Sequence, residues 1–345
     1  MSNTPTPAHK PVVALTLGDA AGIGPELIAR LLSQPGITAE ANIVLVGDAW
    51  LWQQGQATAK QAVVMQAVTS LAEVRGRADT RLPAFLATDT IQQAQVQRSQ
   101  AQAACGTAVL QVLDLCMDGA KRGEVDAICF APLNKQAMKL GGLKHEDELH
   151  HFAEYLGVTG YFCEFNTLGE LWTARVSSHI PLKDAAAMLS KERIMDATRL
   201  IYTSLKASGN ITPRVAVAAF NPHGGDGGVC GSEEIDIIEP AVAALRASGV
   251  PVDGPFPADT IFLKARDGQY QAIVTMYHDQ GQIAIKLMGF SKGVTVQGGL
   301  PVPITTPAHG TAYDIAGKGM ADVNATFNAF KIAQRMGAAR LKPAA

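Results

Sequence analysis

The chain has 345 residues, which is too long for one ordinary hydrophobic core and suits two domains that enclose a cleft. Its formal net charge is -2 at pH 7, so it offers no basic surface for nucleic acid or anionic lipid, and a small molecule is the expected partner. Hydrophobic residues make up 47% of the chain and charged residues 17%, as in compact globular proteins. The five cysteines form no C-x-x-C pair, so we expect reduced packing residues without a catalytic role.

Strands and helices are predicted to alternate along the chain. Residues 1–10 lack the pattern of a signal peptide, and no apolar run approaches the length of a membrane-spanning helix, so we expect a cytoplasmic protein that does not enter a membrane. Short apolar runs predict strands at 12–17, 43–46, 125–130, 171–176, 215–220 and 273–276. Helical patterns lie between them, for example at 101–122 and 233–246. The alternation predicts an α/β sheet.

A glycine-rich turn follows the first expected strand. Residues 18–26 read Gly-Asp-Ala-Ala-Gly-Ile-Gly-Pro-Glu, and a helix is expected to open at Pro25 with Glu26 in its first turn. Backbone amides at such a helix start can face an anion. The spacing matches neither the G-x-G-x-x-G nor the P-loop fingerprint. A purely structural turn is the alternative interpretation.

Three histidines share one setting, directly after an expected strand. They are His179 in Ser-Ser-His-Ile-Pro, His223 in Asn-Pro-His-Gly-Gly and His278 in Tyr-His-Asp-Gln-Gly. Ligands of an open α/β sheet bind beyond the carboxyl ends of its strands, so the three imidazoles are expected around one crevice. Imidazole is a common ligand of divalent metals, and three protein ligands leave positions open for substrate. Each histidine taken singly can equally belong to a turn.

Further polar residues accompany the histidines. Asp279 places a carboxylate beside the third imidazole, and Lys286 follows in an apolar run, where partial desolvation would suit it for proton transfer. The alternative for Lys286 is that its ammonium group extends to water. Asp259 follows a Gly/Pro turn, and by itself would be interpreted as a helix cap.

A loop at 306–319 is the candidate cofactor site. Gly310 permits close approach of a ligand to the backbone, and Thr311 and Asp314 offer hydrogen bonds that can hold the adenosine half of a cofactor. Capping of a following helix is the alternative function of this loop.

The motifs in this order resemble the 4-hydroxythreonine-4-phosphate dehydrogenase (PdxA) family, and in particular its catabolic paralogues. The resemblance is carried by the glycine-rich turn, by Ala-Pro-Leu-Asn-Lys at 131–135, by the three histidine segments, by Pro-Ala-Asp-Thr at 257–260 and by His-Gly-Thr-Ala at 309–312. It implies a two-domain α/β/α fold of the isocitrate/isopropylmalate dehydrogenase type. It also implies an NAD(P)-dependent dehydrogenase acting on CH-OH groups.

The resemblance also implies roles for residues of this chain. His179, His223 and His278 match three ligands of a divalent metal (zinc, magnesium, manganese or cobalt), one of them supplied by the partner subunit of a homodimer with an intersubunit active site. Lys286 matches a substrate-binding lysine, and Lys286, Asp279 or Asp259 would relay the proton. The residues that match the NAD or NADP site are His309, Gly310, Thr311, Ala312 and Asp314.

The sequence departs from the family pattern at the substrate. Thr295 and Ile304 align with a substrate-binding asparagine and arginine, so a bidentate clamp on phosphate or carboxylate is missing at position 304. The family's Gly-His-Thr-Glu loop is replaced by Lys-His-Glu-Asp-Glu-Leu-His-His at 144–151. That stretch is either a second ligand cluster or, the interpretation favoured here, the acidic first turn of a helix that ends near Leu156.

The predicted function is oxidation, with decarboxylation, of a small 4-phosphorylated hydroxy acid such as 4-phospho-D-threonate, 4-phospho-D-erythronate or 4-hydroxythreonine 4-phosphate. The alternatives are a dehydrogenase of a non-phosphorylated diol acid and a non-redox metal-dependent lyase or acyltransferase on the same fold. Residues 1–130 with about 285–345 are expected to form the cofactor domain. Residues 131–284 are expected to bind metal and substrate and to form the dimer.

Overall fold

The computed structural model describes residues 10–289 and 292–341. Residues 1–9, on which the expectation of no signal peptide rests, lie outside the described residues. The chain divides into two compact units, unit 1 (Met1–Gly157 with Pro301–Ala345) and unit 2 (Val158–Leu300). Each unit is described here by itself.

Unit 1 contains a parallel sheet. Its strands lie in the order β3, β4, β2, β1, β5, β12, and every neighbouring pair is parallel. The strands are β1 (Val12–Thr16), β2 (Asn42–Asp48), β3 (Gln66–Val68), β4 (Ala84–Thr88), β5 (Ala127–Phe130) and β12 (Ile304–Pro307). The central strands β1, β2 and β5 are buried along their whole length, which explains why they read as continuous apolar runs.

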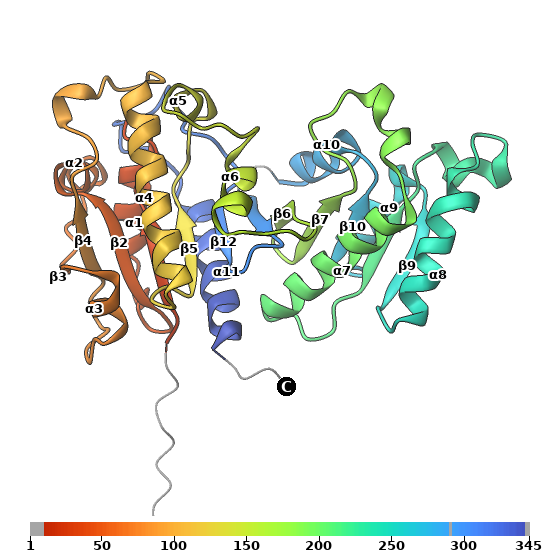
Figure 1. Cartoon of the computed structure of the whole chain (residues 1–345), viewed down its shortest axis with the longest axis horizontal. Coiled ribbons are helices and arrows are strands. Elements are labelled where there is room, and N and C mark those ends of the chain that lie inside the picture. The colour runs from red at the N-terminus through yellow and green to blue at the C-terminus, as the bar shows by residue number, and fades with distance from the viewer. Residues whose placement is uncertain (1–9, 290–291, 342–345) are drawn as a thin grey trace, which may run out of the picture. The chain divides into compact units, whose positions relative to one another are not determined.

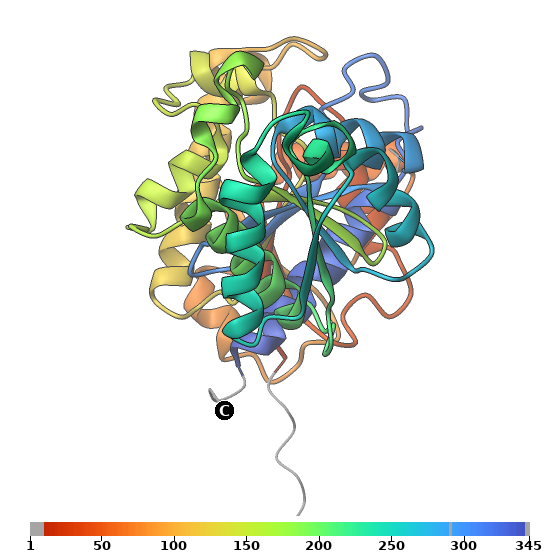
Figure 2. The ribbon, with the colours of Figure 1, turned by 90° about the vertical axis from the view of Figure 1, so that its right-hand side faces the viewer.

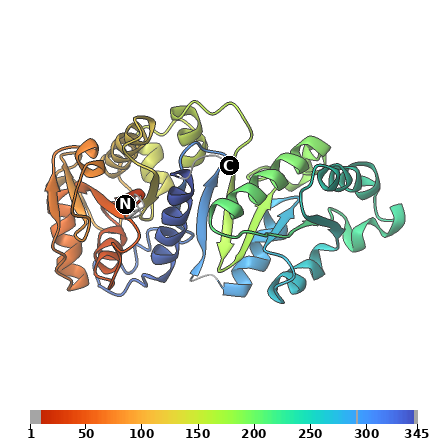
Figure 3. The same ribbon diagram turned by 90° about the horizontal axis from the view of Figure 1, so that it is seen from below.

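Helices cover both faces of the unit 1 sheet. α1 and α11 contact each other on one face, and α4 lies on the other (Figures 1 and 3). The helices are α1 (Gly24–Leu32), α2 (Ala49–Ala59), α3 (Leu71–Arg75), α4 (Ala103–Lys121), α5 (Lys135–Leu140), α6 (Glu148–Tyr155) and α11 (Asn324–Arg340), with a short 3-10 turn η1 (Gln93–Gln95). Of the described helices, α4 is long and apolar enough to span a membrane by length and composition, but 56% of its apolar window is buried in the protein.

Unit 2 contains a mixed sheet in the order β11, β6, β7, β10, β8, β9. The pairs β11/β6 and β6/β7 are antiparallel, whereas β7/β10, β10/β8 and β8/β9 are parallel. The strands are β6 (Cys163–Leu168), β7 (Leu171–Arg175), β8 (Val215–Ala218), β9 (Val252–Phe256), β10 (Ala272–Thr275) and β11 (Val294–Gly298).

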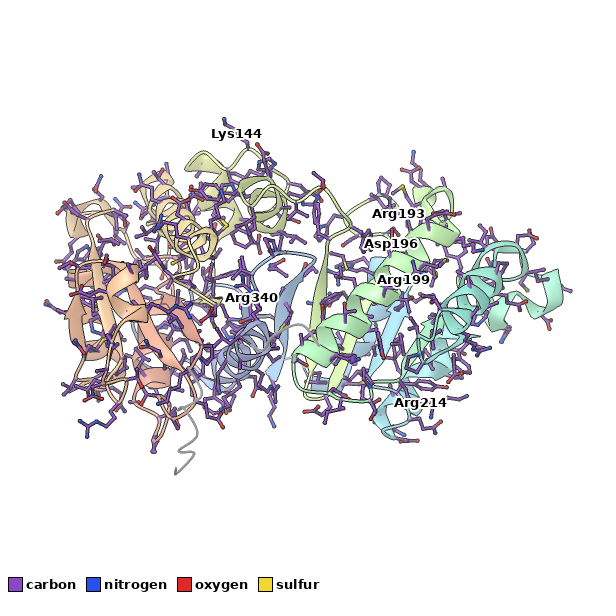
Figure 4. All side chains as sticks on the ribbon, turned by 60° about the horizontal axis from the view of Figure 1, so that its bottom comes forward. Lys144, Arg193, Asp196, Arg199, Arg214 and Arg340 are labelled. Carbon is purple, nitrogen blue, oxygen red and sulfur yellow. The ribbon has the colours of Figure 1, made fainter. Side chains whose placement is uncertain are left out.

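Helices also lie on both faces of the unit 2 sheet. α7 and α8 pack on one face, and α9 and α10 pack on the other (Figures 2 and 3). The elements are α7 (Lys191–Ala207), α8 (Glu239–Ala247), α9 (Ala258–Arg266), α10 (His278–Gly289), the short turns η2 (Leu182–Asp184), η3 (Ala186–Met188) and η4 (Pro222–Gly228), and a π-helical turn η5 (Glu234–Ile238). Arg193, Asp196 and Arg199 mark α7 in Figure 4. The expected helix at 233–246 is therefore a π turn that continues into α8.

The units do not divide where the sequence analysis placed the domain boundaries. Residues 131–157 contain α5 and α6, and both helices contact α4 of unit 1. Residues 285–300 contain the end of α10 and β11, which pair or pack with β6 of unit 2. The observed changes at Gly157 and at Pro301 therefore replace the expected ones near 130 and 285.

A buried aspartate, Asp126, joins three segments of unit 1 through its carboxylate and its backbone carbonyl. Asp126 Oδ2 accepts from the backbone amide of Val12 at 2.7 Å, and Oδ1 forms an ion pair with Arg75 at 2.8 Å. Arg340, labelled in Figure 4, donates to the Asp126 carbonyl at 3.0 Å. Asp126 thus holds β1, α3 and α11 together.

We expect Asp126→Ala to lower the free energy of unfolding by about 2 kcal/mol, because it leaves a buried amide and an arginine without their acceptor. Urea denaturation measures the change. Asp79→Ala is the matched control, since it breaks an exposed ion pair with Arg81 at 2.7 Å and is expected to change stability by less than about 0.5 kcal/mol. Equal losses in the two variants would contradict a structural role for Asp126.

Candidate functional site

The three histidine segments leave unit 2 at one edge of its sheet. β7, β10 and β8 are neighbours and all parallel, so their carboxyl ends face the same way. His179 follows β7, His278 follows β10, and His223 follows β8. The fold thus provides the strand arrangement that sequence spacing alone only suggested.

Two of these histidines have an unfavourable backbone conformation. φ is +52° at His179 and +56° at His223, in the left-handed region that residues other than glycine seldom adopt. Asp226, three residues after His223, also has a positive φ of 46°. Such strain persists where the surrounding structure requires it, and it concentrates at functional sites.

His179 and His278 line one cavity. Their ring centroids are 5.7 Å apart, with an angle of 41° between the ring planes. The cavity has a volume of about 230 Å³ and is lined by Ser177, Ser178, His179, Ile180, Leu182, Ala185, Tyr277, His278 and Asp279. His278 Nδ1 lies 2.7 Å from Asp279 Oδ1, which favours the tautomer with a proton on Nδ1 and a free lone pair on Nε2.

The His223 segment is held by a buried carboxylate. Glu234 accepts from the backbone amides of Phe220 and Asn221 at 2.8 and 2.7 Å, and from the Asn221 side chain at 2.9 Å. A Cβ at Gly225 would lie only 2.6 Å from Glu234 Oε2, so the glycine lets the loop wrap around the carboxylate. Burial alone would raise the pKa of Glu234, but these hydrogen bonds outweigh it and the pKa is lowered.

Gln280 connects two of the strand ends. Its side-chain amide nitrogen donates to the Ala219 carbonyl at 2.8 Å, and its oxygen accepts from the Met276 amide at 2.8 Å. Ala219 lies at the end of β8 and Met276 at the end of β10, so this one side chain fixes the spacing between the His223 and His278 segments.

The chain does not by itself close a set of three histidine ligands. Among the described residues, the ligand atoms of His179, His223 and His278 do not all lie within 4.8 Å of one another. A ring contact joins His179 and His278.

The candidate proton-transfer residues lie on the helices that start at this edge. Asp279 and Lys286 are both exposed and are seven residues apart on α10, so they share a face of that helix nearly two turns apart. Asp259 is exposed in the first turn of α9, which contacts η4, and Pro257 rather than Asp259 occupies the N-cap position. Lys286 is exposed in this chain, so the partial desolvation expected from its apolar neighbours is not observed.

The two residues aligned with substrate contacts are both buried. Thr295 is 6% exposed on β11 and bonds to Asn166 and Glu164. Ile304 is 0% exposed on β12, where it pairs in register with Ile128 of β5. Ile304 is therefore a core residue of unit 1 in this structure, and its side chain makes no contact with solvent.

The candidate cofactor loop packs against the glycine-rich turn within unit 1. The Thr311 carbonyl accepts from the Ile23 amide at 3.1 Å, and a Cβ at Gly22 would lie 2.9 Å from Thr311 Cβ. Tyr313 donates to Asp19 Oδ2 at 2.8 Å. Two motifs that lie almost 290 residues apart in the sequence, if counted from Ile23 to Thr311, are thus in contact in the structure.

The exposed part of this loop has room for a ligand. No heavy atom lies within 4 Å of a Cβ added at Gly310, and His309 and Asp314 are at least partly exposed beside it. Both Ala312 and Ser99 have a positive φ, of 43° and 64°. The hydroxyl of Ser99 donates a hydrogen bond to the Tyr313 carbonyl at 2.5 Å. The segment that contains Ser99, which is distant in the sequence, thus helps to hold the loop in a strained backbone conformation.

The glycine-rich turn itself is structural. Ala21 and Gly22 donate their amides to Asp19 at 2.8 and 3.1 Å, and Ile23 donates to the Thr311 carbonyl. These amides are therefore not available to an anion. Burial raises the pKa of Asp19, although hydrogen bonds from Ala21 and Tyr313 oppose the shift.

The 144–151 stretch forms a helix start, as favoured from sequence. Asp147 is the N-cap of α6 and accepts from the His150 amide at 3.0 Å, and Glu148 lies in the first turn. His151 pairs with Asp114 of α4 at 2.8 Å. Glu146 lies before the helix rather than in its first turn.

Cys105, Cys116 and Cys129 are buried, as expected of packing residues, whereas Cys163 is partly exposed and Cys230 is exposed. All five are free thiols, and burial raises the pKa of Cys116 and Cys129 to about 12. Neither residue is ionised at neutral pH, so neither is a nucleophile there.

Sequence reasoning missed the residues that hold the site. Glu234 gave a signal only as one of the acidic residues that open the helix expected at 233–246, and Arg175 only as a charge at the end of an apolar strand. Arg175 is 5% exposed and bonds to Glu164, Asn166 and Ser178. These contacts join residues 3 to 11 positions apart across a hairpin, which local patterns do not show.

Comparison with known proteins extends over nearly the whole chain. A family model described as pyridoxal phosphate biosynthetic protein PdxA matches residues 39–333. A Pseudomonas aeruginosa protein provisionally named 4-hydroxythreonine-4-phosphate dehydrogenase 2 is 51% identical over 331 residues, which cover 95% of this chain and 97% of the relative. The D-threonate 4-phosphate dehydrogenase of Salmonella typhimurium is 37% identical, with coverage of 94% and 98%.

Solved structures of the same kind share the fold. The 4-hydroxythreonine-4-phosphate dehydrogenase of Klebsiella pneumoniae aligns with a TM-score of 0.82 at 32% identity and covers 96% of this chain and 99% of its own. A terephthalate 1,2-cis-dihydrodiol dehydrogenase from Burkholderia xenovorans aligns with a TM-score of 0.65 at 28% identity, with coverage of 91% and 94%. These similarities confirm the predicted fold class and the predicted enzyme class, a dehydrogenase acting on CH-OH groups.

Proposed function

The chain belongs to the PdxA family, and from this premise we propose that it catalyses metal-dependent, NAD(P)-linked oxidation of a small 4-phosphorylated hydroxy acid. The candidates are 4-phospho-D-threonate, 4-phospho-D-erythronate and 4-hydroxythreonine 4-phosphate. The observation that carries the proposal is the set of three parallel strands that each end in a histidine segment, two of them with left-handed histidines.

The donor set at this edge fits a divalent metal. His179, His223 and His278 would hold it, and the contact between His278 Nδ1 and Asp279 leaves Nε2 for coordination. Zinc, cobalt, manganese and magnesium are the candidates, and imidazole donors favour the transition metals over magnesium. A bound metal supplies Lewis-acid polarisation of the substrate hydroxyl.

The loop at 309–314 fits the adenosine half of NAD or NADP. Its open side faces solvent at Gly310, and its buried side rests on the glycine-rich turn. Thr311 and Ala312 give the loop its shape, and His309 and Asp314 offer polar contacts. The cofactor supplies the hydride acceptor for the carbon that carries the hydroxyl.

We expect Gly22→Ala to raise the KM for NAD(P) by about tenfold, because the added methyl group displaces Thr311 and with it the cofactor loop. Steady-state kinetics measures the change, and metal stoichiometry is expected to stay the same. Gly76→Ala is the matched control, since its Cβ would meet only the Glu73 carbonyl oxygen at 3.8 Å. An unchanged cofactor KM in Gly22→Ala would contradict the placement of the cofactor.

Lys286, Asp279 and Asp259 are the residues proposed to move the hydroxyl proton. Lys286 and Asp279 lie on one face of α10, and Asp259 opens α9 beside the His223 segment. One of these groups takes the proton as the carbonyl forms. Where the oxidised product is a β-keto acid, loss of carbon dioxide follows in this proposal.

A homodimer with an intersubunit site fits the surface of unit 2. Each histidine segment is followed within six residues by an exposed apolar side chain, namely Leu182 (69%), Val229 (82%) and Ile283 (59%). Leu287, next to Lys286, is 83% exposed. Exposed apolar groups beside a polar site favour a partner surface over open solvent.

A screen for NAD(P)H formation tests the proposed reaction. Metal-loaded protein is supplied with NAD or NADP and with phosphorylated and unphosphorylated threonate and erythronate, and the absorbance of the reduced cofactor is followed. We expect turnover of at least one phosphorylated acid and much slower turnover of its unphosphorylated form. Turnover of unphosphorylated acids alone would reject the phosphorylated substrate class.

A second candidate, oxidation of a non-phosphorylated diol acid, is favoured by one observation. The position expected to hold a substrate-binding arginine is Ile304, which is fully buried. The relative from Burkholderia xenovorans is named for a cis-dihydrodiol of terephthalate, which carries no phosphate. Including such a cyclic diol acid in the screen separates the two candidates. A non-redox lyase or acyltransferase would show no saturable NAD(P) binding by calorimetry.

A further inference from the structure

The cavity beside the candidate metal ligands contains no side chain with a permanent positive charge. Within the described part of the chain, its lining residues include neither lysine nor arginine. Every candidate substrate carries a carboxylate, and most carry a phosphate as well. Anionic oxygens need hydrogen-bond donors once they leave water, so some group on this wall must supply them.

A buried arginine lies directly behind the wall of the cavity. Arg175, at the end of β7, is 5% exposed and donates through three nitrogens. Nη2 lies 3.0 Å from Glu164 Oε2, Nη1 lies 2.5 Å from Asn166 Oδ1, and Nε lies 3.0 Å from Ser178 Oγ. Because these contacts engage both edges of the guanidinium plane, its orientation is fixed.

The partners of Arg175 are themselves held in place. Thr295 donates to Glu164 Oε1 at 3.2 Å and accepts from Asn166 Nδ2 at 3.3 Å, and Gln282 of α10 also donates to Asn166. The network therefore links β6, β7, β11 and α10. Arg175 cannot leave it for a ligand without exposing several buried polar groups, which is costly.

Ser178 is the point where this network meets the cavity. It is partly exposed, it lines the cavity with His179 and His278, and its oxygen accepts the hydrogen bond from Arg175. A hydroxyl whose oxygen accepts from a guanidinium must direct its proton elsewhere, and the charge makes it a stronger donor. The neighbouring Ser177 differs, because it gives its proton to the Met276 carbonyl at 2.9 Å.

We propose that Ser178 is a substrate-binding residue that donates a hydrogen bond to an anionic oxygen of the substrate, and that Arg175 is the positioning residue that orients and polarises it. The proposal rests on the proposed function, since it takes the same cavity as the substrate site. It also explains how the site recognises an anion although position 304 is a buried isoleucine.

The test is the substrate affinity of Ser178→Ala. We expect its KM to rise about 10- to 100-fold, the range for losing a hydrogen bond to a charged group, while kcat and metal stoichiometry change little. Ser178→Thr keeps the hydroxyl and is expected to restore most of the affinity. Ser208→Ala is the matched control, because this buried serine donates to the Leu205 carbonyl at 2.8 Å and does not line the cavity, so some loss of thermal stability and an unchanged KM are expected.

Two analogues identify the oxygen that Ser178 contacts. One keeps the phosphate and lacks the carboxylate, and the other keeps the carboxylate and lacks the phosphate. The effect of Ser178→Ala on binding is expected to disappear with the analogue that lacks the contacted group, and either pattern supports the proposal. Equal affinity of wild type and Ser178→Ala for the substrate and for both analogues would overturn it.

A double-mutant cycle tests the role of Arg175. If it acts through Ser178, Arg175→Lys raises KM in the wild-type background and has no further effect on KM in Ser178→Ala. Additive effects would overturn the positioning role.

Calorimetric titration of the substrate into metal-loaded protein keeps the test separate from catalysis. If the protein binds the substrate in a way that depends on Ser178 but does not turn it over, the proposed reaction is rejected and the binding role of Ser178 is retained.

Discussion

His223→Asn is expected to abolish metal binding at the histidine site and to lower kcat by at least about 1,000-fold. The substitution removes one of three imidazole ligands, and a divalent metal held by the remaining two is lost or misplaced. Asparagine tolerates the left-handed backbone that His223 adopts, with φ at +56°, so the loop keeps its shape. Bound metal is measured by elemental analysis after gel filtration, and activity by formation of reduced cofactor.

Two further variants separate ligand loss from strain. His223→Ala also removes the imidazole and is expected to bind no metal, with an added loss of stability from the strained backbone. Asp226→Asn changes an exposed residue of the same loop, where φ is +46°, and is expected to keep both metal and activity. Stoichiometric metal together with full activity in His223→Asn would show that His223 is not a ligand.

Glu234→Ala is expected to lower the free energy of unfolding by about 3 to 5 kcal/mol, the largest effect on stability expected from a single side chain at this site. Its carboxylate, in a residue 1% exposed, accepts from two backbone amides, which lose their partner, and from the Asn221 side chain, which keeps its contact with Glu233. Chemical denaturation of the metal-free protein measures the loss. Metal affinity is expected to fall as well, because the His223 segment loses its anchor.

The pH dependence of this effect has a definite sign. The folded pKa of Glu234 is lowered from the usual 4.5, so its contribution is complete above pH 4.5 and is lost as pH falls through the lower folded value. Glu234→Gln should therefore have a lower free energy of unfolding at neutral pH than wild type. Below pH 4.5 its free energy of unfolding should decrease less steeply with falling pH than that of wild type. Glu233→Gln is the control, since this neighbour has one contact with Asn221, at 2.6 Å. Parallel acid limbs for wild type and Glu234→Gln would contradict the assignment.

The strands that position the histidines could be predicted from the sequence because they are short, mostly apolar and followed by turn residues. β7, β8 and β10 begin within one residue of their expected starts, at Leu171, Val215 and Ala272. Burial on both faces makes such strands continuous in hydrophobicity. That these three strands are parallel neighbours came only with the structure.

Other strands could not be predicted because their patterns are mixed. β6 contains Glu164 and Asn166, and β11 contains Thr295 and Gln297. Glu164, Asn166 and Thr295 find their partners within the Arg175 network. A polar residue in a strand resembles a loop residue until its partner is known, and the partner is a long way off in sequence. The same limitation hid the antiparallel β6/β7 hairpin and displaced the expected domain boundary.

The candidate ligands could be proposed from the sequence, whereas the residues that hold their segments could not. His179, His223 and His278 stand out because each follows an apolar run. Gln280, Glu234 and Arg175 hold these segments through contacts across strands and loops, and their local sequence gives no sign of it. For Lys286 the local sequence was misleading, because its apolar neighbours predicted partial desolvation. Apolar neighbours on a helix can themselves be exposed, as Leu287 is at 83%.

The most direct measurement is the rate of NAD(P)H formation from 4-phospho-D-threonate by the wild-type protein before and after removal of divalent metal. The proposed function predicts that chelation abolishes the rate and that zinc, cobalt, manganese or magnesium restores it, with no restoration in His223→Asn. A rate that persists in full without divalent metal, or that returns in His223→Asn, would contradict a metal-dependent dehydrogenase built on the three histidines.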